Sequence, residues 1–117
     1  MEIWINPACS KCRATTQALD DAGITYTVRR YLDDPPTAEE LTAVLERLNL
    51  EPWDLVRHNE PAAEPLRDLP RDPAHRPTWI EAMVTHPILI QRPILTADDN
   101  TTAITRTPDS LAPFLQG

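Results

Sequence analysis

The chain has 117 residues, which suits one domain with one hydrophobic core. Its formal net charge of −7 at pH 7 argues against a general nucleic-acid-binding or membrane-binding surface. Two cysteines are too few for a secreted disulfide scaffold, and we recognise neither a signal peptide nor an apolar run of about 20 residues, so we expect a cytoplasmic protein.

The first stretch combines a strand pattern with a Cys-x-x-Cys pair. Residues 3–5 predict a short buried strand, residues 6–7 a turn, and residues 13–19 a helix. Cys9 should therefore lie near the positive end of a helix, where the pKa of a thiol falls from about 8.5 toward roughly 3.5–7.5. Cys12 lies one helical turn further along and could resolve a bond formed by Cys9. Beside a βαβ pattern, this spacing is typical of a thioredoxin-like redox motif.

Two other roles of the cysteine pair stay open. The pair could be half of a zinc site, although the sequence has no second cysteine pair and its three histidines lack zinc-ligand spacing. Both cysteines could also be buried core thiols, because a free cysteine often behaves as a small apolar residue.

The next segments continue the βαβ pattern. Gly23 suits the position just after a helix, and the alternation of apolar residues over 24–28 predicts a half-buried strand. Strand, helix and strand in this order predict a right-handed crossover and a parallel strand pair. Thr37 and Glu40 then form the pattern of a capping box before a second helix. The apolar face expected for that helix comprises Leu41, Val44, Leu45 and Leu48.

Six prolines interrupt the following stretch, for which we predict only short helical turns around 53–56 and 62–68. A helix is predicted over 78–85, beginning with a capping box of Thr78 and Glu81. Its inner face is expected to comprise Ile80, Met83 and Val84.

The last part of the chain predicts a hairpin and a helix. Apolar runs at 88–90 and 94–95 are extended segments in our interpretation, and 98–100 is a hairpin-turn signal before a returning strand over 102–105. Residues 108–115 predict a short closing helix. The element order is therefore βαβ, a helical stretch, and ββα.

This order predicts the α/β class, with a thioredoxin-like βαβ–ββα core and a helical insertion between its two halves. The expected core comprises residues 1–34 and 87–117, and the insertion spans about 35–86. We expect residues 1–117 to form a single thioredoxin-like domain.

Several stretches together resemble a known family. They are Asn6-Pro7-Ala8-Cys9 with Arg13, Tyr31-Leu32 with Pro35-Pro36, Leu55-Val56-Arg57 with Asn59, His86-Pro87-Ile88-Leu89-Ile90 with Arg92-Pro93-Ile94, and Arg106 with Pro108. In this order, and over nearly the whole chain, they resemble the glutaredoxin-fold arsenate reductase family, ArsC, and the related Spx regulators. The resemblance implies that Cys9 is the nucleophile and that the oxyanion and its thiol adduct are bound by Arg57, Arg92 and Arg106. It also implies a cis peptide bond at Arg92-Pro93, facing Cys9.

The residues themselves give weaker support for these arginines. A guanidinium suits a tetrahedral oxyanion because its planar fork binds two oxygens at once. Most arginines in this acidic chain are expected to be solvated. Arg92 departs most from that expectation, because it lies between two apolar runs.

The chain differs from the family pattern at two positions. Ile5 stands where family arsenate reductases usually carry a histidine that helps to hold the thiolate. The classical enzyme also has one cysteine here and uses external glutathione and glutaredoxin, whereas this chain has Cys12, as in the Spx branch.

We therefore expect a thiol-dependent arsenate reductase or a closely related thiol reductase with no bound cofactor or metal. Its partners would be a small oxyanion, arsenate, and an external thiol donor: glutathione with glutaredoxin, thioredoxin, or another low-molecular-weight thiol. The alternative is a Spx-like redox-sensing regulator that binds RNA polymerase. The set of oxyanion-binding arginines favours the enzyme.

Overall fold

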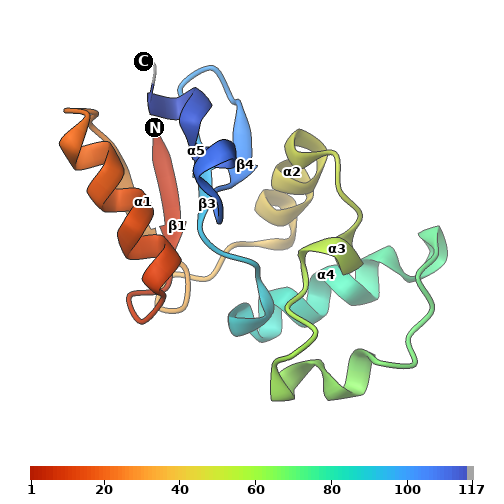
Figure 1. Ribbon diagram of the computed structural model, residues 1–117. Coiled ribbons are helices and arrows are strands. Elements are labelled where there is room, and N and C mark those ends of the chain that lie inside the picture. Colours follow the sequence, from red (N-terminus) through yellow and green to blue (C-terminus); the bar gives the residue numbers. More distant parts are fainter. Residues whose placement is uncertain (116–117) are drawn as a thin grey trace. The chain divides into compact units, whose positions relative to one another are not determined.

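The computed structural model describes residues 1–115, and the chain divides into two compact units (Figure 1). The first unit combines Met1–Asp34 with the chain from Arg92 onward, and the second is Pro35–Gln91. The second unit extends beyond the expected boundary at residue 86, because the segment up to Gln91 is bonded within it. That residues 1–117 form one domain stays a prediction, and the last two residues of the expected core lie outside the described residues.

The first unit contains a four-stranded sheet in the order β2-β1-β3-β4. Its strands are β1 (Glu2–Ile5), β2 (Thr27–Arg30), β3 (Ile94–Thr96) and β4 (Thr102–Ile104). β2 runs parallel to β1, whereas β3 is antiparallel to both β1 and β4. The predicted α/β class and the βαβ–ββα order of the core are confirmed.

Helices α1 (Ser10–Asp21) and α5 (Pro108–Leu115) pack on one face of this sheet (Figure 1). Ile3 of β1 and Leu95 of β3 are register partners and point to that face. They form one buried cluster with side chains from the two helices, which are Leu19, Leu111 and Phe114. Burial of such side chains stabilises the fold by about 1.5–3 kcal/mol each.

The carboxyl end of α1 is closed by a Schellman motif around Gly23. The N–H of Gly23 donates to the carbonyl of Asp20, and the N–H of Ile24 donates to that of Leu19, each at 3.0 Å. Gly23 has a φ of +71°, which confirms the predicted helix end. The same left-handed conformation ends the next helix at Asn49, with a φ of 57°.

The second strand is shorter than the apolar alternation predicted. β2 begins only at Thr27 and lies at the sheet edge, where Val28 remains 43% exposed. Ile24 and Tyr26 precede the strand but pack against the core cluster. The alternation of apolar residues over 24–28 therefore includes a loop segment before β2. Side chains of such a loop can pack against the core although the loop pairs with no strand.

The second unit is helical. Its elements are α2 (Ala38–Leu48), α3 (Pro52–Leu55), η1 (Pro61–Leu66), η2 (Pro73–His75), α4 (Arg76–Thr85) and η3 (Pro87–Leu89), of which the three η elements are 3-10 helices. The capping box of α2 is confirmed: Glu40 N donates to the Thr37 hydroxyl at 3.1 Å, and Thr37 N donates to the Glu40 carboxylate at 3.0 Å. No helix among residues 1–115 has the length and apolar character needed to span a membrane.

Helix α4 begins earlier than predicted. It starts at Arg76 after an N-cap at His75, so the expected capping box of Thr78 and Glu81 does not form. Its buried residues are Trp79 and Met83, whereas the predicted inner residues Ile80 and Val84 are only half-buried. The apolar residues of this helix occupy two adjacent rows, so the sequence pattern did not distinguish the row of Trp79 and Met83 from that of Ile80 and Val84.

The apolar run at 88–90 is not an extended segment. Pro87–Leu89 forms a 3-10 turn, and only Ile90 makes an isolated bridge to Val56. Proline has a fixed φ near −65° and no N–H, which favours the start of a helical turn. The segment is bonded to α3 and its neighbours, because Arg57 N donates to the Leu89 carbonyl at 2.6 Å and Gln91 N to that of Leu55 at 2.9 Å.

We predict that Gly23→Ala lowers the free energy of unfolding by about 1 kcal/mol, because an L-residue with a side chain is strained at positive φ. A Cβ atom at this position would meet nothing within 4 Å, so the cost is conformational and not steric. Urea unfolding followed by circular dichroism measures the effect. Gly23→Asn is the matched control and should lose less, since asparagine tolerates this conformation better. An alanine variant as stable as the parent would contradict the role of this residue.

Candidate active site

One end of the sheet brings together residues with reactive or charged side chains that are distant in the sequence. β1 is antiparallel to β3, and β3 is antiparallel to β4. This end of the sheet therefore contains the end of β1, the start of β3 and the end of β4. Cys9 follows β1, Arg92 precedes β3, and Arg106 follows β4. The topology of the first unit therefore places the candidate nucleophile and two of the predicted arginines at the same end of the sheet.

Five of the acidic residues of the first unit lie at the end of the sheet opposite to Cys9. They lie at the start of β1, at the end of α1 and in the β3–β4 turn, and they are Glu2, Asp20, Asp21, Asp98 and Asp99. Lys11 and Arg13 lie instead in the first turns of α1, beside Cys9. Asp33 and Asp34, after β2, and Asp109, in the first turn of α5, lie at the same end as Cys9, so cations and carboxylates are mixed there.

Cys9 is the N-cap residue of α1. Its backbone is extended, with φ −91° and ψ 120°, and its sulfur accepts a hydrogen bond from the Cys12 N–H at 3.4 Å. The side chain takes the place of the hydroxyl or carboxylate that usually satisfies the first N–H groups of a helix. Both cysteines are free thiols, and the exposed fraction is 8% for Cys9 and 1% for Cys12.

Asn6 shapes the loop that carries Cys9. Its side-chain oxygen accepts from Ala8 N at 3.0 Å, and its carbonyl accepts from Cys9 N at 2.9 Å. Asn6 is buried, and these bonds fix the turn between β1 and α1. The sequence indicates a turn at Asn6-Pro7 and a family motif that includes Asn6, but no role for the Asn6 side chain. The Asx-turn tendency of asparagine was the signal that could have identified Asn6 as a positioning residue.

The two thiols are electrostatically unlike. Burial raises the pKa of the Cys9 thiol, but hydrogen bonds to its sulfur from the Cys12 thiol, the Cys12 N–H, Arg92 and the Lys11 N–H together lower that pKa below its ordinary value. Burial raises the pKa of Cys12 to about 12, and the hydrogen bond to Cys9 and the Cys9 charge act in the same direction against a backbone hydrogen bond from Asn6. Burial alone would fit the core-thiol alternative, whereas the lowered pKa of Cys9 favours a reactive thiolate.

The Arg92 guanidinium has buried N–H groups whose hydrogen bonds are not satisfied among residues 1–115. Its side chain contributes to the lowered pKa of the Cys9 thiol, yet within residues 1–115 its Nε and Nη1 atoms are buried and have no hydrogen-bond partner. Buried N–H groups of a charged side chain are costly when unsatisfied. A bound anion would satisfy them. The peptide bond from Arg92 to Pro93 is cis, which is the geometry that the family resemblance implies.

Arg106 and Arg57 have different surroundings. Arg106 is exposed, and its Nη1 atom donates to the Arg92 carbonyl at 2.9 Å. Arg57 belongs to the second unit, where its Nε lies 3.6 Å from a carboxylate oxygen of Glu60. The structure thus brings Arg106 next to Arg92, while a role for Arg57 at this site stays a prediction.

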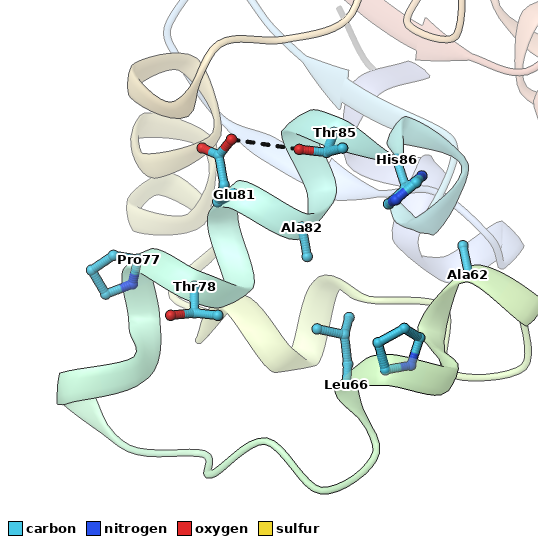
Figure 2. A pocket seen from close by; sticks show the side chains of 9 residues that line it. Ala62, Leu66, Pro77, Thr78, Glu81, Ala82, Thr85 and His86 are labelled. Atoms are coloured by element: carbon cyan, nitrogen blue, oxygen red, sulfur yellow. Dashed lines mark hydrogen bonds between the residues drawn. The ribbon is translucent and has the colours of Figure 1, made fainter.

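A separate pocket lies in the second unit, between η1 and α4, with a volume of about 600 Å³ (Figure 2). Figure 2 shows Leu66 and Ala62 on one side and Thr78 and Ala82 on the other. Its lining is mostly apolar and contains neither cysteine nor arginine, which does not suit an oxyanion. In the described part of the chain, no group of three or more histidine, cysteine or acidic side chains could hold a metal ion.

We predict that iodoacetamide at pH 6 labels Cys9 well before Cys12. The lowered pKa leaves Cys9 with the larger thiolate fraction, whereas a pKa of about 12 keeps Cys12 almost entirely protonated at that pH. Peptide mass spectrometry over a time course distinguishes the two sites. Faster labelling of Cys12, or equally slow labelling of both, would contradict the assignment. Raising the pH to 9 should narrow the difference in labelling rate, because the thiolate fraction of Cys12 increases as the pH approaches its pKa.

Comparison with known proteins supplies the family. A sequence profile described as the ArsC family matches residues 4–114. The chain is 54% identical over 113 residues to an uncharacterized protein in the glnII region of Streptomyces viridochromogenes, covering 95% of each chain. It is 36% identical over 93 residues to an arsenate reductase of Escherichia coli K12, covering 80% of this chain but only 65% of the longer relative.

A solved structure covers nearly the whole chain. An arsenate reductase from Vibrio cholerae superposes with a TM-score of 0.83 at 31% identity, covering 97% of both chains. The matched profile, the curated relatives and this structural likeness agree with the resemblance carried by the sequence motifs, and the fold is thioredoxin-like. The chain belongs to the ArsC family.

Proposed function

We propose that the chain is a thiol-dependent arsenate reductase or a closely related thiol reductase, with Cys9 as nucleophile and Arg57, Arg92 and Arg106 as oxyanion-binding residues. One observation carries the proposal: a thiol whose pKa is lowered lies beside a guanidinium whose Nε and Nη1 atoms are buried and have no hydrogen-bond partner among residues 1–115. A candidate nucleophile and a candidate anion-binding group thus lie at the same end of one sheet. The relatives named arsenate reductase support the same function.

In the first step, the Cys9 thiolate attacks the arsenic of the arsenate monoanion and the bond from arsenic to one hydroxyl breaks. The leaving hydroxide takes the proton of the second hydroxyl and departs as water. The resulting adduct has a bond between the Cys9 sulfur and arsenic(V). Arg92 and Arg106 would balance the negative charge of the remaining oxygens. The helix N-terminus also favours an anion, since its N–H groups point toward the Cys9 sulfur.

In the second step, another thiol attacks the Cys9 sulfur. The electron pair of the sulfur–arsenic bond passes to arsenic, which leaves as arsenite, and the thiol proton goes to an arsenite oxygen. Two thiols are oxidised to one disulfide while arsenic(V) is reduced to arsenic(III). The attacking thiol is Cys12 or an external thiol, and exchange with a further external thiol regenerates Cys9.

The isoleucine at position 5 is compatible with this chemistry. Ile5 packs against the apolar cluster of the first unit and supplies no hydrogen bond to the thiolate. The hydrogen bonds from Cys12 and Arg92 take over the stabilisation that the family resemblance assigns to a histidine.

A second candidate function is a Spx-like redox-sensing regulator that binds RNA polymerase. The Cys9–Cys12 pair favours it, because oxidation to an internal disulfide would give a two-state signal. An arsenate-dependent oxidation assay separates the candidates when it is run with glutathione and glutaredoxin, with thioredoxin, and with other small thiols. Failure with every donor, together with binding to RNA polymerase, would make the regulator the better assignment.

We predict that Arg92→Ala lowers kcat/KM for arsenate by at least about tenfold while the protein stays folded. Losing a charged hydrogen bond to a buried anion costs about 1.5–3 kcal/mol, which corresponds to roughly 10- to 150-fold in rate. Arg92→Lys should recover only part of the activity, since an ammonium cannot make the forked contact.

Arg67→Ala is the matched control for this series. Arg67 is 66% exposed and forms a surface ion pair with Glu64, so its removal should leave kcat/KM nearly unchanged. Arg57→Ala and Arg106→Ala test the other predicted arginines in the same assay. Equal kinetics for Arg92→Ala and Arg67→Ala would exclude the proposed anion site.

We also predict that mild oxidation produces a Cys9–Cys12 disulfide if Cys12 is the resolving thiol, making the protein about 2 Da lighter in a manner that reductant reverses. Cys12→Ser should instead accumulate a mixed disulfide on Cys9 when a small thiol is present. Intact-protein mass spectrometry follows both products. Unchanged turnover of Cys12→Ser would show that the resolving thiol comes from outside the chain.

A further inference from the structure

We infer that Thr15 and Thr105 form a buried clamp that fixes the distance between the Cys9 thiolate and the Arg92–Arg106 pair, which makes them positioning residues of the proposed active site. Neither residue was singled out by the sequence motifs. The inference deepens the proposed function and rests on it for the reaction, but the clamp itself can be tested without arsenate.

Thr15 connects the helix that carries Cys9 to the end of the sheet. Its hydroxyl donates to the Thr105 carbonyl at 3.2 Å and lies 3.1 Å from the Thr105 hydroxyl. Because the single proton of Thr15 is used on the carbonyl, the Thr105 hydroxyl donates to Thr15 in turn. Within a helix, a threonine hydroxyl more often bonds to a carbonyl of the preceding turn. The adjacent Thr16 does so, donating to Arg13 O at 3.0 Å.

Thr105 holds two other parts of the site. Its N–H donates to the Pro93 carbonyl at 3.1 Å, which ties it to the segment that begins with Arg92. The next residue, Arg106, bonds through Nη1 to the Arg92 carbonyl at 2.9 Å. Thr105 therefore links helix α1, the chain before β3 and the chain after β4 at one point.

The clamp is buried, which gives its hydrogen bonds weight. Thr15 is 1% exposed and Thr105 is 3% exposed, so water does not replace a lost partner. Arg92 contributes to the lowered pKa of the Cys9 thiol, and such a contribution depends steeply on the distance and orientation of the two groups. In catalysis, a misplacement of about 1 Å can cost about a hundredfold in rate.

The test measures the thiolate and the reaction separately. Thr105→Val and Thr15→Val keep the side-chain shape but remove one hydroxyl each. We expect both to slow iodoacetamide labelling of Cys9 at pH 6 by at least about threefold and to lower kcat/KM for arsenate by at least about tenfold. Thr105→Ser retains the hydroxyl and should remain close to the wild type. Thr16→Val, at a half-buried position of the same helix outside the clamp, is the matched control and should change neither quantity.

Thermal unfolding of each variant guards against a merely structural effect. Should the valine variants fail to fold, Thr105→Ser and Thr105→Ala replace them, because both lose the methyl group and only alanine loses the hydroxyl. Labelling of Cys9 in folded Thr105→Val at the wild-type rate overturns the clamp, as does a serine variant that labels as slowly as the alanine variant. A wild type without arsenate activity, whose valine variants still label slowly, rejects the proposed function and retains the clamp.

Discussion

A negative charge on a nearly buried sulfur atom is the constraint on which the arrangement of the first unit depends. Burial opposes the thiolate, so the fold must return hydrogen bonds to the sulfur of Cys9. The first turn of α1 supplies backbone N–H groups, and the loop around Asn6 holds Cys9 at the N-cap. Arg92 contributes from the other side, through a chain segment that is distant in the sequence.

The asymmetry between the two cysteines follows from the same constraint. Once Cys9 carries the charge, its neighbour is driven to stay protonated, and the pKa of Cys12 rises to about 12 mainly through burial. A protonated Cys12 is a hydrogen-bond donor to the thiolate and also a latent second thiol. In the proposed reaction, the same residue would first stabilise the nucleophile and could afterwards serve as the second thiol.

Charge is distributed unevenly in the first unit, but it is not separated. Five of its acidic residues lie at the end of the sheet where α1 ends and the β3–β4 turn lies, whereas Lys11, Arg13, Arg92 and Arg106 belong to the end that carries Cys9. Asp33, Asp34 and Asp109 also belong to the Cys9 end. The strand directions therefore place cations near Cys9 in an acidic chain without removing every carboxylate from that end.

The sequence by itself determined the local elements, because these depend on neighbouring residues: the strand–turn–helix with Cys9 at the helix start, the Thr37–Glu40 capping box, and the helix end at Gly23. Its motifs also indicated the family. Where local signals were ambiguous, as for the start of α4 and the segment after Pro87, packing and proline geometry decided the outcome. The family resemblance already implied that Arg92 lies near Cys9. Only the tertiary structure brought Thr15 to Thr105, because antiparallel pairing joins chain segments whose separation in the sequence carries no record of their distance in space.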